Sequence, residues 1–393
     1  MQDLIKPLAA GAAALLIACG GSADNASTDN ASTDEASATE GDTVGGTESE
    51  GAGSSSSGLP MPDPEGSSSS SSGEDTSVDS ASSSSGSDAE DALERLPLLG
   101  DVLNPEGIGV DTQTGDLYVG ATLGGSIQRI SGGEAEWWKT VDEGDGLRPV
   151  TVGVTVDSEG RRLIACTNAV DMATFEVSEA AVVVYDLDSR ELLADVVLPP
   201  LGPSNLCNDV AVTAEGTIYA SDSSANMLWA VDDAYQITPV VEPGVFAESS
   251  LPQFGANGLD ITPDGRFLLI TLTFDPHLYR FDLETEEVLE VELSGMPYPG
   301  GDGITFVDDD TLVSVQNAVE HDIVSVKFTG ADYESATVAS AIDDSEVFDS
   351  MSRPTTAALY EDRLFVVNGQ FEIEVPELPF WVTSIPLSRL ALD

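Results

Sequence analysis

Residues 256–271 read Ala-Asn-Gly-Leu-Asp-Ile-Thr-Pro-Asp-Gly-Arg-Phe-Leu-Leu-Ile-Thr, an apolar segment, a turn and a second apolar segment. The sequence Thr262-Pro263-Asp264-Gly265 is typical of a tight turn, and short segments rich in aromatic and β-branched residues predict strands. Two more segments of the same kind follow. The stretch therefore predicts a unit of four strands, at 259–261, 267–271, 277–282 and 288–293.

The same pattern occurs six times between Glu106 and Asn368. The copies begin 46, 56, 49, 45 and 53 residues apart, a spacing that indicates stacked repeats. The first copy predicts strands at 108–111, 117–121, 126–130 and 136–141, and no convincing amphipathic helix intervenes. The first residues of the copies are Glu106, Val152, Asn208, Asn257, Asp302 and Thr355.

A four-stranded sheet of roughly 50 residues cannot bury both of its faces alone, so the six sheets must pack on one another. Radial packing leaves only short, protected edges. The sequence therefore predicts an all-β fold, a six-bladed β-propeller of four-stranded blades over residues 96–393. Since the innermost strands line the central channel, residues at their starts should meet at one end of it.

The segment before the repeats differs sharply in composition. Residues 20 to 95 contain several runs of serine, and no Lys or Arg lies between Lys6 and Arg95. Such a segment lacks the apolar surface that would offset the entropy of ordering. We expect residues 19–95 to form a disordered, acidic, Ser/Gly-rich tether.

The start of the chain predicts how this tether is anchored. Lys6 precedes an apolar run, 8–18, that is too short to span a bilayer. The run ends Leu16-Ile17-Ala18-Cys19, which resembles a bacterial lipobox. We expect residues 1–18 to be a lipoprotein signal peptide and Cys19 to be lipidated, with an ordinary secretory signal as the alternative. Gly20 favours an outer-membrane anchor, which would place the domain in the periplasm or on the cell surface.

The charge of the chain limits its partners. The formal charge is −56, and residues 96–393 alone carry 52 acidic and 12 basic residues. This balance excludes a nucleic-acid partner and is typical of a protein that stays soluble in salty or Ca²⁺-containing medium. We expect a monomer that meets the membrane only through its lipid. Cys166 and Cys207 are an even pair in an oxidising compartment, which permits a disulfide without requiring one.

Four of the six copies begin with an oxygen-bearing side chain: Glu106, Asn208, Asn257 and Asp302. Two carboxylates and two amide carbonyls form a hard ligand set that suits a divalent cation, Ca²⁺ best. A cation with open positions can polarise a carbonyl or lower the pKa of water, as ester or lactone hydrolysis requires. Taken singly, each residue also suits a turn before a strand, where its side chain bonds neighbouring backbone.

Four phrases carry a family resemblance: Asn104-Pro-Glu-Gly-Ile, Cys207-Asn-Asp-Val, Ala256-Asn-Gly-Leu-Asp-Ile-Thr-Pro-Asp-Gly and Gly301-Asp-Gly-Ile. They resemble the senescence-marker-protein/gluconolactonase family, also called regucalcin-like, and the resemblance covers about residues 97 to 390. It implies a propeller with one divalent cation at the channel mouth, commonly Ca²⁺ and in some members Zn²⁺ or Mn²⁺. It also implies hydrolysis of sugar lactones and assigns the four residues above as ligands.

By the same resemblance Asp302 is the general base as well as a ligand, Asn208 lies closest to substrate, and Asp209 has an orienting role. The sugar-lactone hydrolases tend to carry an arginine two residues before that asparagine, and here the residue is Leu206. An apolar Leu206 in the substrate site suits a more hydrophobic lactone or ester. It equally suits a pocket that kept the metal and lost the reaction.

Two functions therefore remain in competition: an envelope-anchored, metal-dependent hydrolase of lactones or esters, and a non-catalytic propeller that binds a ligand or protein partner. An electron-transfer propeller has less support, because cofactor and haem motifs are missing. His277 and His321 lie outside any recognisable motif, and we expect them to be structural. We expect Trp137 and Trp138 to pack between blades.

Overall fold

The computed structural model describes residues 91–392, apart from 102, 142–145, 172–175, 202–203, 248–253, 299, 317–321 and 372. The predicted signal peptide (1–18), Cys19 and nearly all of the predicted tether (19–95) lie outside the described residues. Within the described part of the chain, no helix combines the length and apolarity needed to cross a bilayer.

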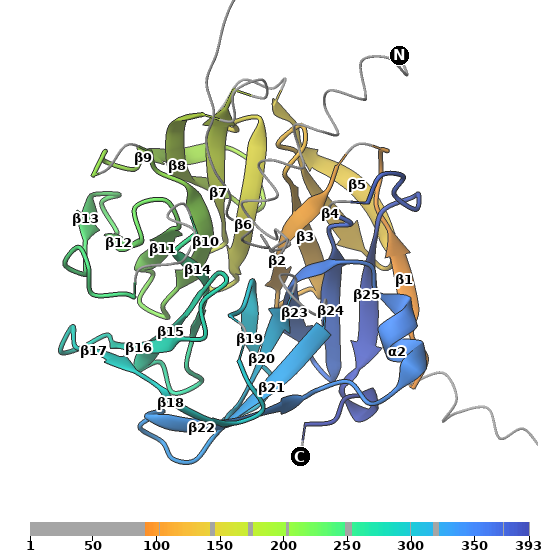
Figure 1. Ribbon diagram of the computed structural model, residues 1–393. Helices are drawn as coiled ribbons and strands as arrows, with labels where there is room; N and C mark the ends of the chain where they lie inside the picture. Colours follow the sequence, from red (N-terminus) through yellow and green to blue (C-terminus); the bar gives the residue numbers. More distant parts are fainter. Residues whose placement is uncertain are drawn as a thin grey trace, which may run out of the picture. The chain divides into compact units, whose positions relative to one another are not determined.

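Six sheets, each built around four antiparallel strands, confirm the predicted propeller (Figure 1). The first three, each written from the inner to the outer strand, are β2 (Pro105–Asp111), β3 (Asp116–Ala121), β4 (Ile127–Ser131), β5 (Glu134–Lys139); β6 (Val150–Asp157), β7 (Arg162–Val170), β8 (Val177–Asp186), β9 (Leu192–Val197); and β10 (Cys207–Val212), β11 (Ile218–Asp222), β12 (Met227–Val231), β13 (Ile237–Pro239).

The other three are β14 (Ala256–Ile261), β15 (Phe267–Leu272), β16 (Leu278–Asp282), β17 (Val288–Glu290); β19 (Ile304–Phe306), β20 (Thr311–Gln316), β21 (Asp322–Phe328), β22 (Ser335–Ser340); and β23 (Pro354–Tyr360), β24 (Arg363–Asn368), β25 (Trp381–Pro386), β1 (Glu94–Pro97). Each predicted strand of the first and fourth copies overlaps an observed one. We number the sheets as blades 1 to 6 in this order.

The ring is closed by its first strand. β1 pairs antiparallel with β25 and so forms the outer strand of blade 6 (Figure 1). The inner strands β2, β6, β10, β14, β19 and β23 contact one another in turn, and β23 contacts β2. β1 begins at Glu94, two residues before the predicted start of the domain. The closure joins the two ends of the domain in one sheet, which no local sequence pattern specifies.

Two features depart from the four-strand pattern. β18 (Glu292–Gly295) follows the outer strand of blade 4 and pairs in parallel with β22, so blade 5 has five strands. A short helix, α2 (Ser345–Ser350), precedes blade 6, and a 3-10 turn, η2 (Leu387–Arg389), follows it. The side chain of Asp344 accepts a hydrogen bond from the backbone N of Glu346 and so caps α2.

Hydrophobic residues fill the junctions between blades. Among the described residues, separate buried clusters occupy each of the six junctions. Phe267, for example, is fully buried between blades 4 and 5, and burying a side chain of this size contributes roughly 1.5–3 kcal/mol. The second strands are buried on both faces because sheets cover them on both sides, whereas the outer strand β9 alternates between exposed and covered residues. Trp138 packs in the junction of blades 1 and 2 as expected, but Trp137 is 42% exposed.

The inner strands approach one another closely enough to require glycine. A Cβ atom on Gly107 would lie 2.2 Å from the carbonyl oxygen of Val152, and one on Gly258 would lie 2.2 Å from that of Asp302. Real Cβ atoms do not approach backbone this closely, so a larger residue at either position would force the blades apart. Each glycine directly follows a candidate ligand, and the tight contact holds the starts of the inner strands together.

Candidate metal centre

The candidate ligands lie at irregular starts of the inner strands. In β2, β10 and β14 the pairing with the second strand shifts register, and Glu106, Asn208 and Asn257 each fall within the shift. A bulge of this kind redirects a side chain away from the regular alternation. Asp302 lies just before β19, where its backbone N donates to the oxygen of Val315 at 2.9 Å. All four side chains are at most 4% exposed.

Two of the four ligands touch directly. The Nδ2 atom of Asn257 donates to Oδ1 of Asp302 at 2.9 Å, across the junction of blades 4 and 5. Glu106 comes from blade 1, and its backbone oxygen accepts a hydrogen bond of 3.0 Å from Oγ1 of Thr355. The side chain of Glu106 is close enough to Asp302 for their charges to interact. The fold therefore brings residues about 200 positions apart in sequence to one end of the ring.

The electrostatics of this end favour a cation. Burial, with the carboxylates of Asp302 and Asp209 nearby, raises the pKa of Glu106 well above its usual range. Negative charges held together in a buried position repel one another unless a proton or a metal ion neutralises them. A divalent cation would satisfy Glu106 and Asp302 together.

One atom of the set has no hydrogen-bond partner among the residues that the structure describes. The Oδ1 atom of Asn208 is buried and accepts no hydrogen bond, while Nδ2 of the same amide donates to Oγ of Ser223 at 2.8 Å. A buried carbonyl oxygen without a partner destabilises the fold, so we expect a bound ion or molecule to contact this oxygen. Amide oxygen is a ligand that Ca²⁺ accepts. The residues present thus fit a hard divalent cation held by two carboxylates and two amides.

No cluster of three or more His, Cys, Asp or Glu side chains within the described ranges is arranged to hold a metal. The proposed set contains only two such residues, because Asn208 and Asn257 supply its other two oxygens. His277 forms contacts elsewhere: its Nδ1 lies 2.8 Å from Oε1 of Glu290, and its Nε2 lies 3.3 Å from Oδ1 of Asp275. His321 is outside the described residues.

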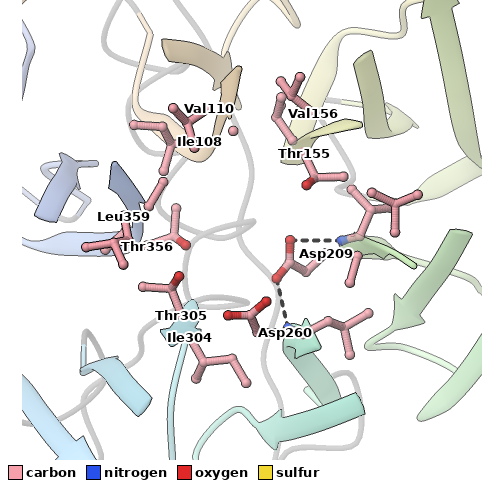
Figure 2. A pocket seen from close by; sticks show the side chains of 18 of the residues that line it. Ile108, Val110, Thr155, Val156, Asp209, Asp260, Ile304, Thr305, Thr356 and Leu359 are labelled. Atoms are coloured by element: carbon pink, nitrogen blue, oxygen red, sulfur yellow. Dashed lines mark hydrogen bonds between the residues drawn. The ribbon is translucent and has the colours of Figure 1, made fainter. Parts of the chain in front are cut away.

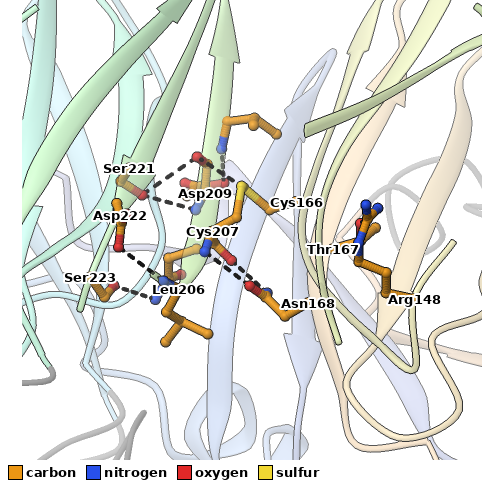
Figure 3. Close-up of a disulfide and its surroundings, with 12 residues drawn as sticks. Arg148, Cys166, Thr167, Asn168, Leu206, Cys207, Asp209, Ser221, Asp222 and Ser223 are labelled. Atoms are coloured by element: carbon orange, nitrogen blue, oxygen red, sulfur yellow. Dashed lines mark hydrogen bonds between the residues drawn. A yellow bond between two sulfur atoms is a disulfide. The ribbon is translucent and has the colours of Figure 1, made fainter. Parts of the chain in front are cut away.

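A disulfide lies at the start of β10 (Figure 3). Cys166 of β7 and Cys207 of β10 are bonded to each other, so the pairing that the sequence left open is formed. The amide of Asn168 adds two hydrogen bonds, donating to the oxygen of Cys207 at 2.8 Å and accepting from its backbone N at 3.0 Å. Blade 2 is thereby fixed to the start of β10, and Asn208 is the next residue.

Leu206 precedes the disulfide and is 6% exposed. Its backbone N donates to Oδ1 of Asp222 at 2.9 Å, and its oxygen accepts from the backbone N of Ser223 at 3.0 Å. Leu206 is two residues before Asn208, at the position where the resemblance led us to expect a substrate contact. Its contact with substrate remains a prediction.

Further along the channel lies a cavity of about 250 Å³, lined by the inner strands (Figure 2). Asp209 and Asp260 point into it from blades 3 and 4. Burial raises the pKa of Asp209 to about 6 and that of Asp260 to about 7, although backbone hydrogen bonds oppose the shift in both. Sequence reasoning gave Asp209 at most an orienting role and did not single out Asp260.

Both channel carboxylates link neighbouring blades. Asp209 accepts from the backbone N of Val210 at 2.8 Å and from that of Leu259, on the next blade, at 2.9 Å. Asp260 accepts from Ile261 at 2.8 Å and from Phe306, on the next blade, at 2.7 Å. Each of these side chains therefore joins two neighbouring blades through backbone donors.

Sequence reasoning also missed the hydroxyl groups that hold the amide ligands. Ser223 bonds Asn208, and Thr273 bonds Asn257 with an Nδ2–Oγ1 distance of 2.6 Å. Each hydroxyl residue directly follows the second strand of its blade, in Asp222-Ser223 and Leu272-Thr273. A hydroxyl at that shared position is the signal that could have identified them.

The fold and this end of the ring together define a six-bladed propeller with a candidate cation site. Residues 104–315, more than half of the chain, match the family described as SMP-30/Gluconolactonase/LRE-like region. The chain belongs to that family, which confirms the resemblance read from its motifs. No curated protein matches the chain.

Solved structures agree on the fold. Regucalcin from Agrobacterium tumefaciens, described as a calcium-binding protein, is 14% identical and superimposes with a TM-score of 0.51 over 76% of this chain and 95% of that one. A luciferin-regenerating enzyme is 12% identical, with a TM-score of 0.50 over 77% and 97%. A gluconolactonase from Xanthomonas campestris is 14% identical, with a TM-score of 0.49 over 75% and 88%. At these identities the first two support the fold alone.

Proposed function

We propose that the protein is a divalent-metal-dependent hydrolase of lactones or related esters. The observation that carries the proposal is the unpaired, buried Oδ1 of Asn208 beside a centre with two carboxylates, Glu106 and Asp302. Family membership and the calcium-binding description of regucalcin support one cation, Ca²⁺ in the first place and Zn²⁺ or Mn²⁺ as alternatives. When bound, such a cation polarises a carbonyl group and lowers the pKa of water.

The side chains would divide the work as follows. Glu106, Asn208, Asn257 and Asp302 would hold the cation. Asp302 would also accept the proton of the attacking water, while Nδ2 of Asn257 keeps its Oδ1 in place at 2.9 Å. Asn208 would lie nearest to the substrate carbonyl, and Leu206 would favour a substrate with an apolar group.

Asp302→Ala tests this function. We expect the variant to lose calorimetric Ca²⁺ binding and Ca²⁺-dependent turnover of a panel of lactones and esters, because it loses a ligand and the base together. Asp349→Ala, which removes an exposed carboxylate on α2, is the control and should match the wild type. Undiminished turnover in Asp302→Ala would refute the mechanism.

A second candidate is a non-catalytic propeller in which the cation has a structural role. It is favoured by Leu206, which replaces the polar residue that the resemblance implies for sugar-lactone hydrolysis. Here the wild type binds Ca²⁺ but shows no Ca²⁺-dependent activity on the panel. Calcium binding together with a rise in melting temperature would then be its measurable property.

We also propose that the domain is a monomer anchored to a bacterial envelope through a lipid on Cys19. The disulfide between Cys166 and Cys207 supports this placement, since such bonds persist mainly in oxidising compartments. Labelled palmitate should be incorporated by the wild type and lost in Cys19→Ala. Release of an unlabelled wild-type protein would favour the ordinary secretory signal.

A further inference from the structure

The hydrogen bonds around Asn208 determine which end of its amide faces the candidate centre. Oγ of Ser223 donates to the backbone oxygen of Ala256 at 2.7 Å. A carbonyl oxygen can only accept, and a serine hydroxyl has one hydrogen to donate. The hydroxyl of Ser223 can therefore only accept a hydrogen bond from the side chain of Asn208.

It follows that Asn208 must turn its NH₂ group toward Ser223, which lies 2.8 Å from Nδ2. The opposite orientation would set the amide oxygen against the lone pairs of the hydroxyl. The orientation is thus fixed by hydrogen-bond chemistry and does not depend on telling nitrogen from oxygen by position. The amide oxygen is left unpaired on the other side.

Asn257 is held in the same way by two acceptors. Its Nδ2 donates to Oγ1 of Thr273 at 2.6 Å and to Oδ1 of Asp302 at 2.9 Å, which uses both hydrogens of the NH₂ group. Ser223 and Thr273 are 0% and 2% exposed, so water does not compete for these bonds. These two bonds fix the NH₂ group of Asn257, so its amide oxygen lies on the opposite branch, facing away from Thr273 and Asp302.

We infer that Ser223 is a positioning residue that fixes the amide of Asn208 with its oxygen toward the cation, and that Thr273 supports Asn257 in the same way. The inference rests on the proposed metal centre. Without Ser223 the amide could rotate. Its NH₂ group, which carries partial positive charge, would then face the cation and repel it. Loss of such supporting contacts typically weakens metal binding by about 10–100-fold.

A matching arrangement in blade 6 shows what is special about Asn208. Oγ1 of Thr383 donates to the oxygen of Ser350 at 3.0 Å and accepts from Nδ2 of Asn368 at 3.0 Å. There, however, Oδ1 of Asn368 accepts from the backbone N of Ser352 at 2.7 Å. The same relay thus serves the backbone in blade 6 and leaves an oxygen unpaired in blade 3.

The first experiment is calorimetric titration of the purified propeller-containing chain with Ca²⁺. We expect Ser223→Ala to bind about 10–100-fold more weakly than the wild type. Thr273→Val should lose less, because Asp302 still holds the amide of Asn257. Thr383→Val is the matched control: it removes an equivalent buried hydroxyl and should lower the melting temperature while leaving Ca²⁺ affinity unchanged.

The second experiment separates orientation from simple loss of structure. An aspartate at 208 has two equivalent oxygens and needs no orientation, and one of them would face the lone pairs of Ser223. Starting from Asn208→Asp, we therefore expect Ser223→Ala to leave Ca²⁺ affinity unchanged or to raise it. A merely structural role would lower affinity in both backgrounds, which would overturn the inference.

The outcomes also separate this inference from the proposed function. A wild-type chain that binds neither Ca²⁺, Zn²⁺ nor Mn²⁺ overturns the metal centre and the inference with it. A wild type that binds Ca²⁺ with an affinity that Ser223→Ala leaves unchanged overturns the inference alone. Because the readout is binding, the test holds for a catalytic and for a non-catalytic propeller.

Discussion

Two pairs of acidic residues lie in the middle of this ring, and they differ in the groups that surround their carboxyl oxygens. Asp209 and Asp260, in the channel, give both oxygens to backbone N–H groups of two adjacent blades. Glu106 and Asp302 lie at the mouth beside an unpaired amide oxygen, and burial together with the charge of Asp302 raises the pKa of Glu106. The partners of a buried carboxylate thus distinguish a group that joins blades from one that we propose to bind a cation.

Among the variants that test this comparison, Asp260→Asn should have the largest effect, on the pH dependence of stability. Because burial raises the pKa of Asp260 to about 7, the folded chain keeps a proton that the unfolded chain loses near pH 4. This carboxyl therefore favours the fold at low pH, and its contribution falls as pH rises from about 4 to about 7. The stability of the wild type relative to the variant should fall over that window by up to about 4 kcal/mol.

The measurement is the unfolding free energy of both proteins at several pH values without added cation. Above about pH 8 the difference should be constant, since both states of the wild type are then ionised. Calcium affinity should stay within about twofold of the wild type. A stability difference that does not vary with pH would show that Asp260 is ionised throughout.

Removing the disulfide tests whether the mouth depends on the ring or on its own hydrogen bonds. Cys166 and Cys207 close a loop of sequence separation 41, and bonds of this kind contribute typically 2–4 kcal/mol. We expect the double variant Cys166→Ala, Cys207→Ala to lose about that much unfolding free energy and therefore to unfold at a lower denaturant concentration. Its Ca²⁺ affinity should fall only a few-fold, because Ser223 still holds Asn208.

Treating the wild type with a reductant under partly denaturing conditions is the matched control and should reproduce the loss of stability. An unchanged denaturation midpoint would mean that the pair contributes nothing to the ring. A loss of Ca²⁺ affinity as large as that of Asp302→Ala would show that the disulfide, and not Ser223, positions Asn208.

Glu106→Gln tests whether the carboxylate of Glu106 at the mouth binds a cation. The amide removes a buried negative charge beside Asp302 and Asp209, so without cation the variant should be more stable than the wild type near pH 8. With Ca²⁺ the order should reverse, because ligand charge sets affinity and we expect a loss of about 100-fold, or about 2.7 kcal/mol. Thermal unfolding with and without Ca²⁺ measures both effects, and lower stability in both conditions would contradict the assignment.

Much of the site could be read from the sequence because a repeat converts position in a copy into position in space. Asn257 and Asp302 were grouped on this basis, and they touch. Ser223 was not found, since a serine after a strand is common and its partner lies 15 residues earlier in the chain. Asp260 was not found because an acidic residue within a strand is usually solvent-exposed, and only the closed channel surrounds it with protein.

Local sequence patterns are enough to predict the number of blades, the approximate strands and the phase that brings the candidate ligands to one end, because hydrophobic periodicity and turn residues act locally. Three features follow from the folded chain alone: β1 closes the ring, Cys166 bonds Cys207, and the oxygen of Asn208 is left unpaired. These last features depend on the three-dimensional distance between groups far apart in the chain. Local sequence patterns do not specify that distance.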